Sequence, residues 1–289
     1  MSEKFKYYSP SAIKNLFQNS DAAIRKKWGQ NFLIDPNISR KIAELLTADT
    51  SGSILEIGPG LGVLTKQYLE SGRDVFAVEI DAFLVDELKK EFSEYKNLHL
   101  FNQDAVVFIH DLIAGTEQKD TLHDKSSIRS VGGNLPYYIT SELLTNIVFI
   151  PGLTRGVFLV QKEYAMRCVV EKSESSLNVF LNNFGKWKIA MKVPPPAFFP
   201  VPGVHSSVLV FEPFQEPVCD ASVLQTVLRM SFRGRRKKIK NAWAMTEGIY
   251  SMEKMTEAAE EAQLSVQKRP EEITREEFYH FTECLKKII

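Results

Sequence analysis

The residue types best suited to chemistry stand together in the stretch 133–140, which reads Gly-Asn-Leu-Pro-Tyr-Tyr-Ile-Thr. The side-chain oxygen of Asn134 and the backbone carbonyl of Pro136 can both accept hydrogen bonds from the exocyclic amine of a nucleobase. That amine is a poor nucleophile because its lone pair is delocalised into the ring, and holding both of its hydrogens lets the nitrogen pyramidalise. Tyr137 offers a flat face to the base, and such stacking is worth about 1–3 kcal/mol. The stretch therefore indicates methyl transfer to a base amine, although a strand that ends in a Pro-Tyr turn would show the same residues.

A second motif could hold the methyl donor. Residues 53–65 read as a strand, a turn with glycines at positions 58, 60 and 62, and the start of a helix. Glycines let the backbone approach a ligand closely, and such a turn leaves N–H groups free. Glu79 belongs to the next strand, 74–81, and lies about twenty residues beyond the glycines, which is the spacing of a carboxylate that binds ribose hydroxyls. The spacing fits both NAD and S-adenosylmethionine, and Glu79 could instead cap a helix, but the alternating glycines suit a ligand made of an amino acid and a nucleoside.

Strands and helices alternate around these motifs. Apolar strands are expected at 98–101, 128–133, 156–160 and 205–211 as well. This alternation predicts an α/β fold with a doubly wound parallel sheet. Asp104 follows the strand 98–101, and ligands bind at the carboxyl ends of the strands in such sheets. Asp104 could therefore accept a hydrogen bond from an adenine amine, or it could simply cap the next helix.

The composition changes near Glu212-Pro213, and the chain is long enough for two domains, since a domain usually has about 100–200 residues. From Asp220 onward glycine and proline become rare and the apolar residues follow a helical period. Thr274 and Glu277 have the spacing of a capping box ahead of the last helix. We therefore predict a catalytic domain over 1–211 and a small all-helical domain over 212–289.

Basic residues are concentrated locally although the chain is neutral overall, with 36 Lys and Arg against 36 Asp and Glu. Six of the eight residues in 233–240 are basic, and they are Arg233, Arg235, Arg236, Lys237, Lys238 and Lys240. A second cluster is Arg25-Lys26-Lys27. Cations gathered in this way predict contact with a polyanion such as RNA, and the alternative is a solvated helix face.

Other classes of protein find no support in the sequence. The three cysteines are scattered and form no Cys-x-x-Cys pair, and the five histidines have no metal-ligand spacing. This pattern argues against a disulfide framework or a metal site and fits a reducing compartment. The N-terminus lacks an apolar signal core, and no run approaches the ~20 apolar residues of a membrane span. We expect a cytoplasmic protein with no bound metal and no membrane contact.

Taken in order, the motifs resemble those of the small-subunit (16S) ribosomal RNA adenine N6-dimethyltransferases, the KsgA/RsmA family. The motifs that carry the resemblance are 29–33, 56–62, 78–81, 134–137, 198–202 with Ser206, and 232–241. The resemblance runs from about Gln30 to the end of the chain. It implies a Rossmann-like class I methyltransferase sheet and S-adenosylmethionine as methyl donor. It also implies methylation of N6 of two adjacent adenosines near the 3′ end of 16S rRNA, in an assembling 30S particle, by a monomer.

The resemblance also implies roles for individual residues. The residues expected to bind the cofactor are Asn31, Leu33, Gly58, Gly60, Glu79, Asp104 and Asn134. Among them, Glu79 would hold the ribose hydroxyls and Asp104 the adenine amine. The residues expected at the reacting base are Asn134, Pro136, Tyr137 and Phe198, with the two aromatic rings on either side of the base. The six basic residues of 233–240 would bind RNA.

The sequence departs from the family pattern in two places. Gly132-Gly133 stands where apolar residues are more usual, which is expected to loosen the end of that strand, and the polar loop 115–127 has no counterpart. Three other functions remain open. A large-subunit rRNA adenine methyltransferase of the macrolide-resistance type shares the Asn-Pro-Tyr motif, but the basic segment 233–241 favours the small-subunit family. An RNA-binding assembly factor with secondary catalysis is a second possibility, and a nicotinamide dehydrogenase, which lacks an identifiable catalytic His or Tyr–Lys pair here, is a third.

Overall fold

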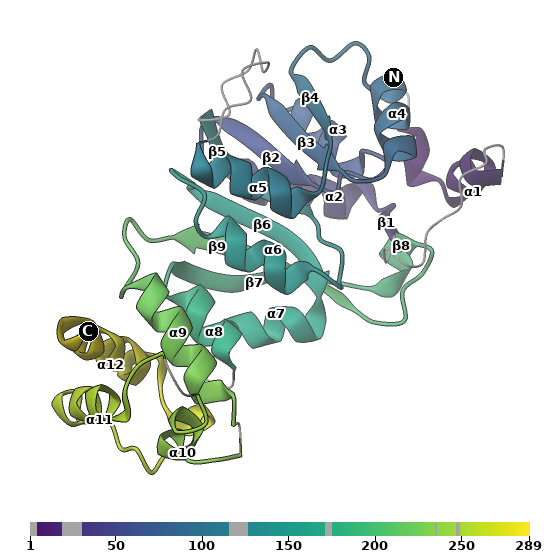
Figure 1. The fold of residues 1–289 in the computed structure, drawn as a ribbon. Coiled ribbons are helices and arrows are strands. Elements are labelled where there is room, and N and C mark those ends of the chain that lie inside the picture. The colour runs from purple at the N-terminus through teal and green to yellow at the C-terminus, as the bar shows by residue number, and fades with distance from the viewer. Residues whose placement is uncertain (1–4, 19–30, 116–126, 171–174, 235, 247–248) are drawn as a thin grey trace. The chain divides into compact units, whose positions relative to one another are not determined.

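The computed structural model describes residues 5–18, 31–115, 127–170, 175–234, 236–246 and 249–289 (Figure 1). These form two compact units, one made of Met1–Ala165 and Lys188–Glu212, the other of Met166–Trp187 and Pro213–Ile289. The cluster Arg25-Lys26-Lys27, Arg235 and most of the polar loop 115–127 lie outside the described residues.

The first unit is built on a seven-stranded sheet with the strand order β4-β3-β2-β5-β6-β9-β7. The strands are β2 (Ser53–Ile57), β3 (Val75–Glu79), β4 (Leu98–Asn102), β5 (Ile128–Asn134), β6 (Arg155–Gln161), β7 (Gly185–Val193) and β9 (Ser206–Pro213). Strands β2 to β6 pair in parallel, and β9 pairs with β6 in the antiparallel sense. The predicted α/β fold with a parallel, doubly wound sheet is confirmed, and β9 is an antiparallel strand whose direction the sequence did not reveal.

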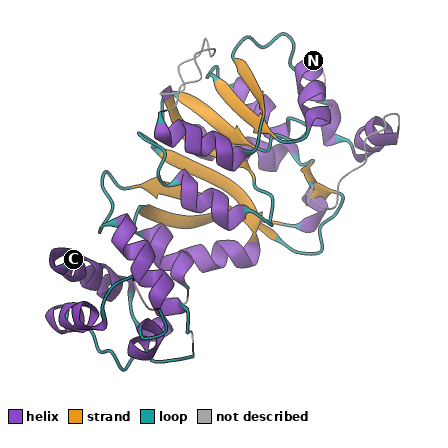
Figure 2. Cartoon of the chain, viewed as in Figure 1, coloured by secondary structure: helices purple, strands orange, loops and turns teal. Residues whose placement is uncertain are grey.

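Helices cover both faces of this sheet. Figure 1 shows α5 (Ala105–Ala114) and α6 (Thr140–Ile147) on one face and α2 (Pro36–Thr47) and α3 (Val63–Leu69) on the other, and Figure 2 shows the same layers by secondary structure. Every residue of β2 and β3 is buried, as expected for strands that are covered on both faces. Helix α2 begins as its sequence predicts, because Asp35 accepts hydrogen bonds from Asn37 N and Ile38 N and Pro36 occupies the first turn.

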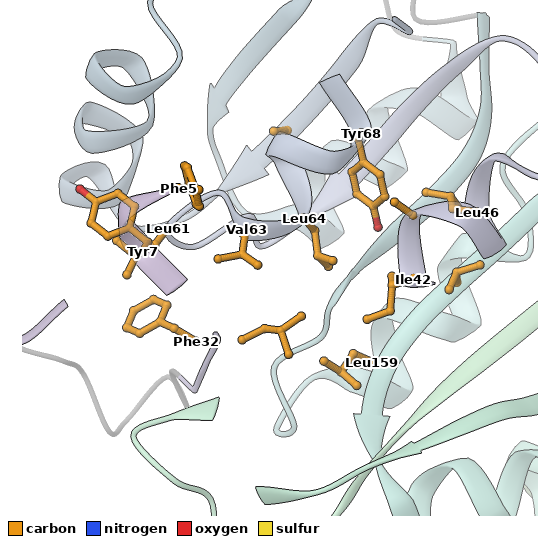
Figure 3. Packing of buried hydrophobic residues seen from close by; sticks show 14 of the residues in the cluster. Phe5, Tyr7, Phe32, Ile42, Leu46, Leu61, Val63, Leu64, Tyr68 and Leu159 are labelled. Atoms are coloured by element: carbon orange, nitrogen blue, oxygen red, sulfur yellow. The ribbon is translucent and has the colours of Figure 1, made fainter. Parts of the chain in front are cut away.

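The hydrophobic core of this unit lies between the sheet and α2 and α3. Figure 3 shows Ile42 and Leu46 of α2, Leu64 of α3 and Leu159 of β6 in one cluster of buried side chains. The N-terminal segment adds to it through the 3-10 helix Lys6–Tyr8 and α1 (Pro10–Gln18). Burial of these large side chains, at roughly 1.5–3 kcal/mol each, fixes the strands whose ends carry the polar residues.

Three strands were not predicted: β7 in the seven-stranded sheet and two short strands outside it. β1 (Phe32–Leu33) pairs antiparallel with β8 (Phe198–Phe199), with Phe32 opposite Phe199 and Leu33 opposite Phe198. The remaining elements of the first unit are α4 (Ala82–Glu91), the start of α7 (Lys162–Val169) and the 3-10 helix Pro195–Ala197. This pairing holds the segment after residue 30 against the loop that precedes β9.

The second unit is helical, as the sequence predicts. Its elements are α8 (Ser176–Asn182), α9 (Ala221–Phe232), α10 (Ile239–Trp243), α11 (Met252–Glu261), the 3-10 helix Pro270–Glu272 and α12 (Arg275–Ile288). The capping box forms, with Thr274 N donating to Glu277 Oε2 (2.8 Å) and Glu277 N to Thr274 Oγ1 (3.1 Å). The ring of Trp243 stacks on Phe281 with centroids 5.2 Å apart. No described helix of the chain is long and apolar enough to cross a membrane.

The compact units divide the chain differently from the predicted ranges 1–211 and 212–289. Residues 166–187 belong to the helical unit because their polar groups are bonded within it. Asn183 Nδ2 donates to Cys219 O (3.0 Å), Cys219 N donates to Asn183 Oδ1 (2.9 Å), and Tyr279 Oη donates to Val179 O (2.8 Å). These partners are far apart in sequence, so a change in local composition could not mark them. The division of labour between two domains stays a prediction.

Candidate active site

A pocket opens at the carboxyl ends of β2, β3, β4 and β5, where the strand order reverses between β2 and β5. This is the place where open α/β sheets bind ligands. Its wall is formed by residues from the segments 31–33, 56–64, 78–84, 103–105 and 134–139. The pocket therefore brings together both motifs with which the sequence analysis began.

The glycine turn forms one wall of the pocket. Gly58, Gly60 and Gly62 have φ values of 65°, 59° and 82°, a region that is costly for residues with a Cβ. Gly58 N donates to Val78 O (3.0 Å), so the turn is bound to the end of β3. The alternation of glycines follows from this backbone path, which supports the interpretation of the turn as a ligand cradle.

Glu79 lies in the pocket with a fixed orientation. Its Oε2 accepts a hydrogen bond from Gly60 N (3.2 Å) and its Oε1 accepts one from Asp81 N (3.0 Å). Burial raises the pKa of Glu79, and the backbone N–H groups of Asp81 and Gly60 oppose that rise. The helix cap that follows is Asp81, which accepts from Phe83 N (3.1 Å), so Glu79 is not the capping acid. A carboxylate held in this way is ready to accept hydrogen bonds from ribose hydroxyls.

Asp104 combines the two roles that the sequence left open. It caps α5 by accepting hydrogen bonds from Val106 N (2.8 Å) and Val107 N (3.4 Å), and both bonds use Oδ1. The same side chain lines the pocket, where Oδ2 can accept from a ligand amine. Capping and ligand binding are therefore compatible at this residue.

Asn134 ends β5 and is tied to a distant segment. Its Nδ2 donates to Asn31 O (2.8 Å), across 103 positions of sequence. The bond commits the amide nitrogen and leaves Oδ1 as the atom that can accept from a base amine. Asn31, Leu33 and Asn134 all line the pocket, so three of the predicted cofactor residues lie together.

The carbonyl of Pro136 already has partners within the chain. It accepts hydrogen bonds from Thr140 Oγ1 (2.8 Å) and from Ile139 N (3.3 Å). A carbonyl oxygen has two lone pairs, so a base amine would have to displace one of these donors, and the longer Ile139 bond is the weaker of the two. The acceptor role of Pro136 stays a prediction, and it now requires this local exchange.

The two predicted aromatic partners lie in different surroundings. Tyr137 lines the pocket, and its hydroxyl is 3.1 Å from Ser206 Oγ at the start of β9. Phe198 is only 1% exposed and belongs to the hydrophobic core rather than to the pocket wall. The pocket wall therefore includes Tyr137 but not Phe198, and a base sandwich between the two rings stays a prediction.

Gly132 and Gly133 have a packing reason that the sequence did not show. A Cβ on Gly132 would lie 2.6 Å from the Tyr68 hydroxyl, and one on Gly133 would lie 2.2 Å from Ile57 O. Both glycines are paired with β6, and Gly132 is also paired with β2. The glycines therefore let β5 come close to β2 and α3, whereas we had expected them to loosen the end of the strand.

Glu56 is a pocket residue that the sequence analysis missed. It is 1% exposed in β2, it lines the pocket, and its Oε2 has no hydrogen-bond partner within the described residues. Burial raises its pKa to about 8. The available signal was an acid inside the otherwise apolar strand Ser-Ile-Leu-Glu-Ile.

The residues present fit S-adenosylmethionine, the cofactor expected from the motifs. A buried carboxyl oxygen without a partner is costly, and a ligand that carries an ammonium group would satisfy it. The glycine turn, Glu79 and Asp104 supply the backbone and carboxylate groups for the nucleoside part. Within the described part of the chain, no group of three His, Cys, Asp or Glu residues could hold a metal ion.

The predicted RNA-binding residues belong to the second unit, in the segment that joins α9 to α10. Arg233, Arg236, Lys237, Lys238 and Lys240 are exposed, whereas Ile239 is buried. Lys238 Nζ donates to Gln267 Oε1 (2.7 Å), and no ion pair of the described residues involves any of the five. Their charges are therefore available to phosphates, although their contact with RNA stays a prediction.

Comparison with known proteins decides the family. The model of the ribosomal RNA adenine dimethylase family matches residues 22–287. The chain belongs to this family. A relative from Clostridium botulinum (strain Kyoto / Type A2), named Ribosomal RNA small subunit methyltransferase A, is 33% identical over 286 residues, which are 96% of this chain and 99% of that protein. A relative of the same name from Geobacillus kaustophilus (strain HTA426) is 35% identical over 241 residues, 81% of this chain and 80% of that protein.

Solved structures agree with the α/β fold of this dimethylase family member. A dimethyladenosine transferase from Plasmodium falciparum matches with a TM-score of 0.68 and 22% identity, over 86% of this chain and 94% of that one. The 23S rRNA methyltransferase ErmE matches with a TM-score of 0.64 and 23% identity, over 89% of this chain and 100% of that one. At these identities the likeness is one of fold. The resemblance to the small-subunit family is confirmed. The large-subunit alternative is weaker, because it has only the shared Asn-Pro-Tyr motif and this likeness of fold behind it.

Proposed function

We propose that this member of the dimethylase family transfers methyl groups from S-adenosylmethionine to N6 of two adjacent adenosines near the 3′ end of small-subunit (16S) rRNA. The observation that carries the proposal is the position of Asn134, which ends β5 in the pocket wall beside the glycine turn. A base amine held there would meet a methyl donor that lies over the turn.

Within this proposal the chain acts by positioning. The bound cofactor supplies an already activated methyl group on its sulfonium. Glu79 and Asp104 bind the nucleoside part, and Asn134 Oδ1 accepts from the target amine because its Nδ2 is committed to Asn31 O. Tyr137 supports the base by stacking, with its ring oriented by Ser206. Alignment of this kind can contribute several kcal/mol, and the surplus proton leaves to water because an amide side chain is no base at ordinary pH.

The proposed partner is 16S rRNA within an assembling 30S particle, and the proposed enzyme is a cytoplasmic monomer. The exposed cations of the segment 233–240 support an RNA partner. Unpaired adenosines would be favoured, because extruding a base from a stack costs a few kcal/mol.

The test is to incubate the protein with labelled S-adenosylmethionine and unmethylated 30S particles and then map the label. Label in adjacent adenosines near the 3′ end of 16S rRNA is the expected result. Label in large-subunit RNA would instead identify the macrolide-resistance type of activity. Binding to the particle without any label would leave an assembly factor.

A variant links this activity to the pocket. Asn134→Ala should lower the single-turnover rate by on the order of 10²–10³-fold at saturating cofactor and RNA, by analogy with the loss of one preorganised polar group. Cofactor affinity is measured separately, because Asn134 is also expected to touch the cofactor. A wild-type rate in this variant would show that the motif is not the catalytic centre.

A further inference from the structure

Three buried oxygen atoms near the pocket lack hydrogen-bond partners within the described residues. They are Glu56 Oε2 of β2 and the hydroxyl oxygens of Thr65 and Tyr68 of α3. Figure 3 shows the Tyr68 ring pointing inward, with its hydroxyl among apolar side chains. Three unsatisfied oxygens in one place are unusual, since most buried polar atoms have partners.

Thr65 and Tyr68 both interact with the carboxyl group of Glu56. Thr65 lies close enough to lower the pKa of Glu56 through its N–H and hydroxyl, although its hydroxyl makes no hydrogen bond of good geometry. The charge of Glu56 raises the already high pKa of Tyr68, so the Tyr68 hydroxyl keeps its proton and can act as a donor. On the neighbouring strand β5, Gly132 is paired with Glu56 and has no side chain that could donate a hydrogen bond to its carboxyl group.

The electrostatic surroundings of Glu56 favour the neutral acid. Burial is the main cause that raises the pKa of Glu56. Besides Tyr68, the titratable group that acts on it is Glu79 on β3, whose negative charge raises the pKa further. Among the described residues that influence Glu56 there is no Lys, Arg or His. A carboxyl group that is buried, unpaired and close to a second acid holds its proton at neutral pH.

We propose that Glu56 gives up this proton when S-adenosylmethionine binds, so that cofactor binding is coupled to release of one proton from the chain. This inference rests on the proposed function only for the identity of the cofactor. The O–H bond of the Glu56 carboxyl breaks, the proton passes to water, and the carboxylate accepts N–H bonds from the ammonium group of the cofactor. The sulfonium cannot take that role because it has no hydrogen to donate to the unpartnered oxygen.

The two neighbouring hydroxyls explain how the pocket tolerates the new charge. Hydroxyl groups rotate to suit their partners, so Thr65 and Tyr68 can turn their hydrogens toward the carboxylate once it forms. Charge-assisted hydrogen bonds of this type are stronger than neutral ones. The pocket thus holds donors that become useful only in the ligand-bound state.

The coupling has a direct consequence for affinity. While Glu56 is neutral in the free protein, the dissociation constant should fall about tenfold for each unit of pH, as linkage requires. The pH dependence of the dissociation constant should be measured between about pH 6 and 7.5. An α-amino group itself titrates at ~8, so the ligand would lose its own charge at higher pH.

Isothermal titration calorimetry tests the proposal on the full-length protein. Titrations at about pH 6.5 in two buffers with different ionisation enthalpies count the protons released, and we expect close to one for S-adenosylmethionine. S-adenosylhomocysteine, which keeps the ammonium group, should release the same number. 5′-Methylthioadenosine, which lacks the amino-acid part, should release none. Release by S-adenosylmethionine but not by S-adenosylhomocysteine would overturn the assignment to the ammonium group.

Two variants assign the proton to its residue. Glu56→Gln keeps the size of the side chain and has no proton to lose, so both the release and the pH dependence of affinity should disappear. Glu142→Gln removes an exposed carboxyl of α6 that does not line the pocket, and it should leave the release in place. The proposal fails if the wild-type protein releases no proton, whether or not the Glu56→Gln variant folds. Methyl transfer to 30S particles is measured independently, so its presence without proton release would overturn this inference alone.

Discussion

A single methyl group at Gly133 should displace the edge of the active site. The Cβ of Gly133→Ala would lie 2.2 Å from Ile57 O and 3.2 Å from Ile57 C, which are backbone atoms, and real Cβ atoms essentially never come within 3.0 Å of such a neighbour. No rotamer change can relieve this clash. The end of β5 must therefore move away from β2. This movement changes the spacing between Asn134 and the glycine turn.

The loss of stability in Gly133→Ala can be estimated from the general cost of overpacking a protein core. Forcing a methyl into a packed interior costs about 1–3 kcal/mol, and each kcal/mol lowers the melting temperature by about 2–4 °C for a unit of this size. We therefore expect Gly133→Ala to melt roughly 2–12 °C below the wild type. Its affinity for S-adenosylmethionine should also fall, because Asn134 and Gly58 no longer keep their spacing.

Thermal unfolding followed by circular dichroism and calorimetry of cofactor binding measure the two effects. The matched control is Gly203→Ala, since a Cβ on Gly203 meets nothing within 4 Å, and it should resemble the wild type in both assays. If Gly133→Ala kept the wild-type melting temperature and cofactor affinity, the close approach of β5 to β2 would not be the reason for glycine at this position.

Three further predictions follow from the same structure. Tyr137→Phe should lose only the hydrogen bond to Ser206, worth about 0.5–1.5 kcal/mol, and keep most methyl transfer, whereas Tyr137→Ala should lose stacking worth about 1–3 kcal/mol; equal single-turnover rates for the two variants would contradict the stacking role. Because folding raises the pKa of Glu56 from 4.5 to about 8, the folded chain holds a proton that the unfolded chain has lost, and stability falls as pH rises from about 5 to 8. Without cofactor at about pH 8, the Glu56→Gln variant should therefore be more stable than the wild type, by up to roughly 5 kcal/mol in free energy of unfolding at ~1.4 kcal/mol per pKa unit. The difference in stability should vanish near pH 5, and a difference independent of pH would refute this reasoning. Replacing Arg236 and Lys237 by Ala should flatten the slope of log affinity for RNA against log salt by about one unit for each phosphate that is no longer bound. An unchanged slope would mean that these two residues only form a solvated surface and do not contact RNA.

Local patterns predicted the parts of the fold that depend on neighbours in the sequence. The strands, the glycine turn and the caps at Asp35 and Thr274 follow from apolar periodicity and from the backbone conformations that each residue type allows. The position of Glu79 at the end of a parallel strand then follows from the sheet. For these features the sequence holds nearly all the information, because each is decided within a few residues.

Features that depend on distant contacts could not be predicted in this way. The bond from Asn134 to Asn31 spans 103 positions, and the burial of Phe198 depends on its pairing with Leu33. The unsatisfied state of Glu56 depends on what is absent around it, since only the folded environment shows that no cation of the described residues faces it. Local periodicity carries no signal for any of the three.

The antiparallel direction of β9 affects how this site can diversify. Because β9 runs against β6, with Ser206 opposite Gln161, its first residue rather than its last lies at the edge where the parallel strands end. The connection 194–205 therefore reaches the site from the opposite chain direction to the connections that carry Gly58, Glu79 and Asp104. Insertions or substitutions in that connection can reshape its own side of the site without altering the length of the segments that carry Gly58, Glu79 and Asp104. The topology thus allows this side of the site to vary while the loops at the carboxyl ends of the parallel strands stay unchanged.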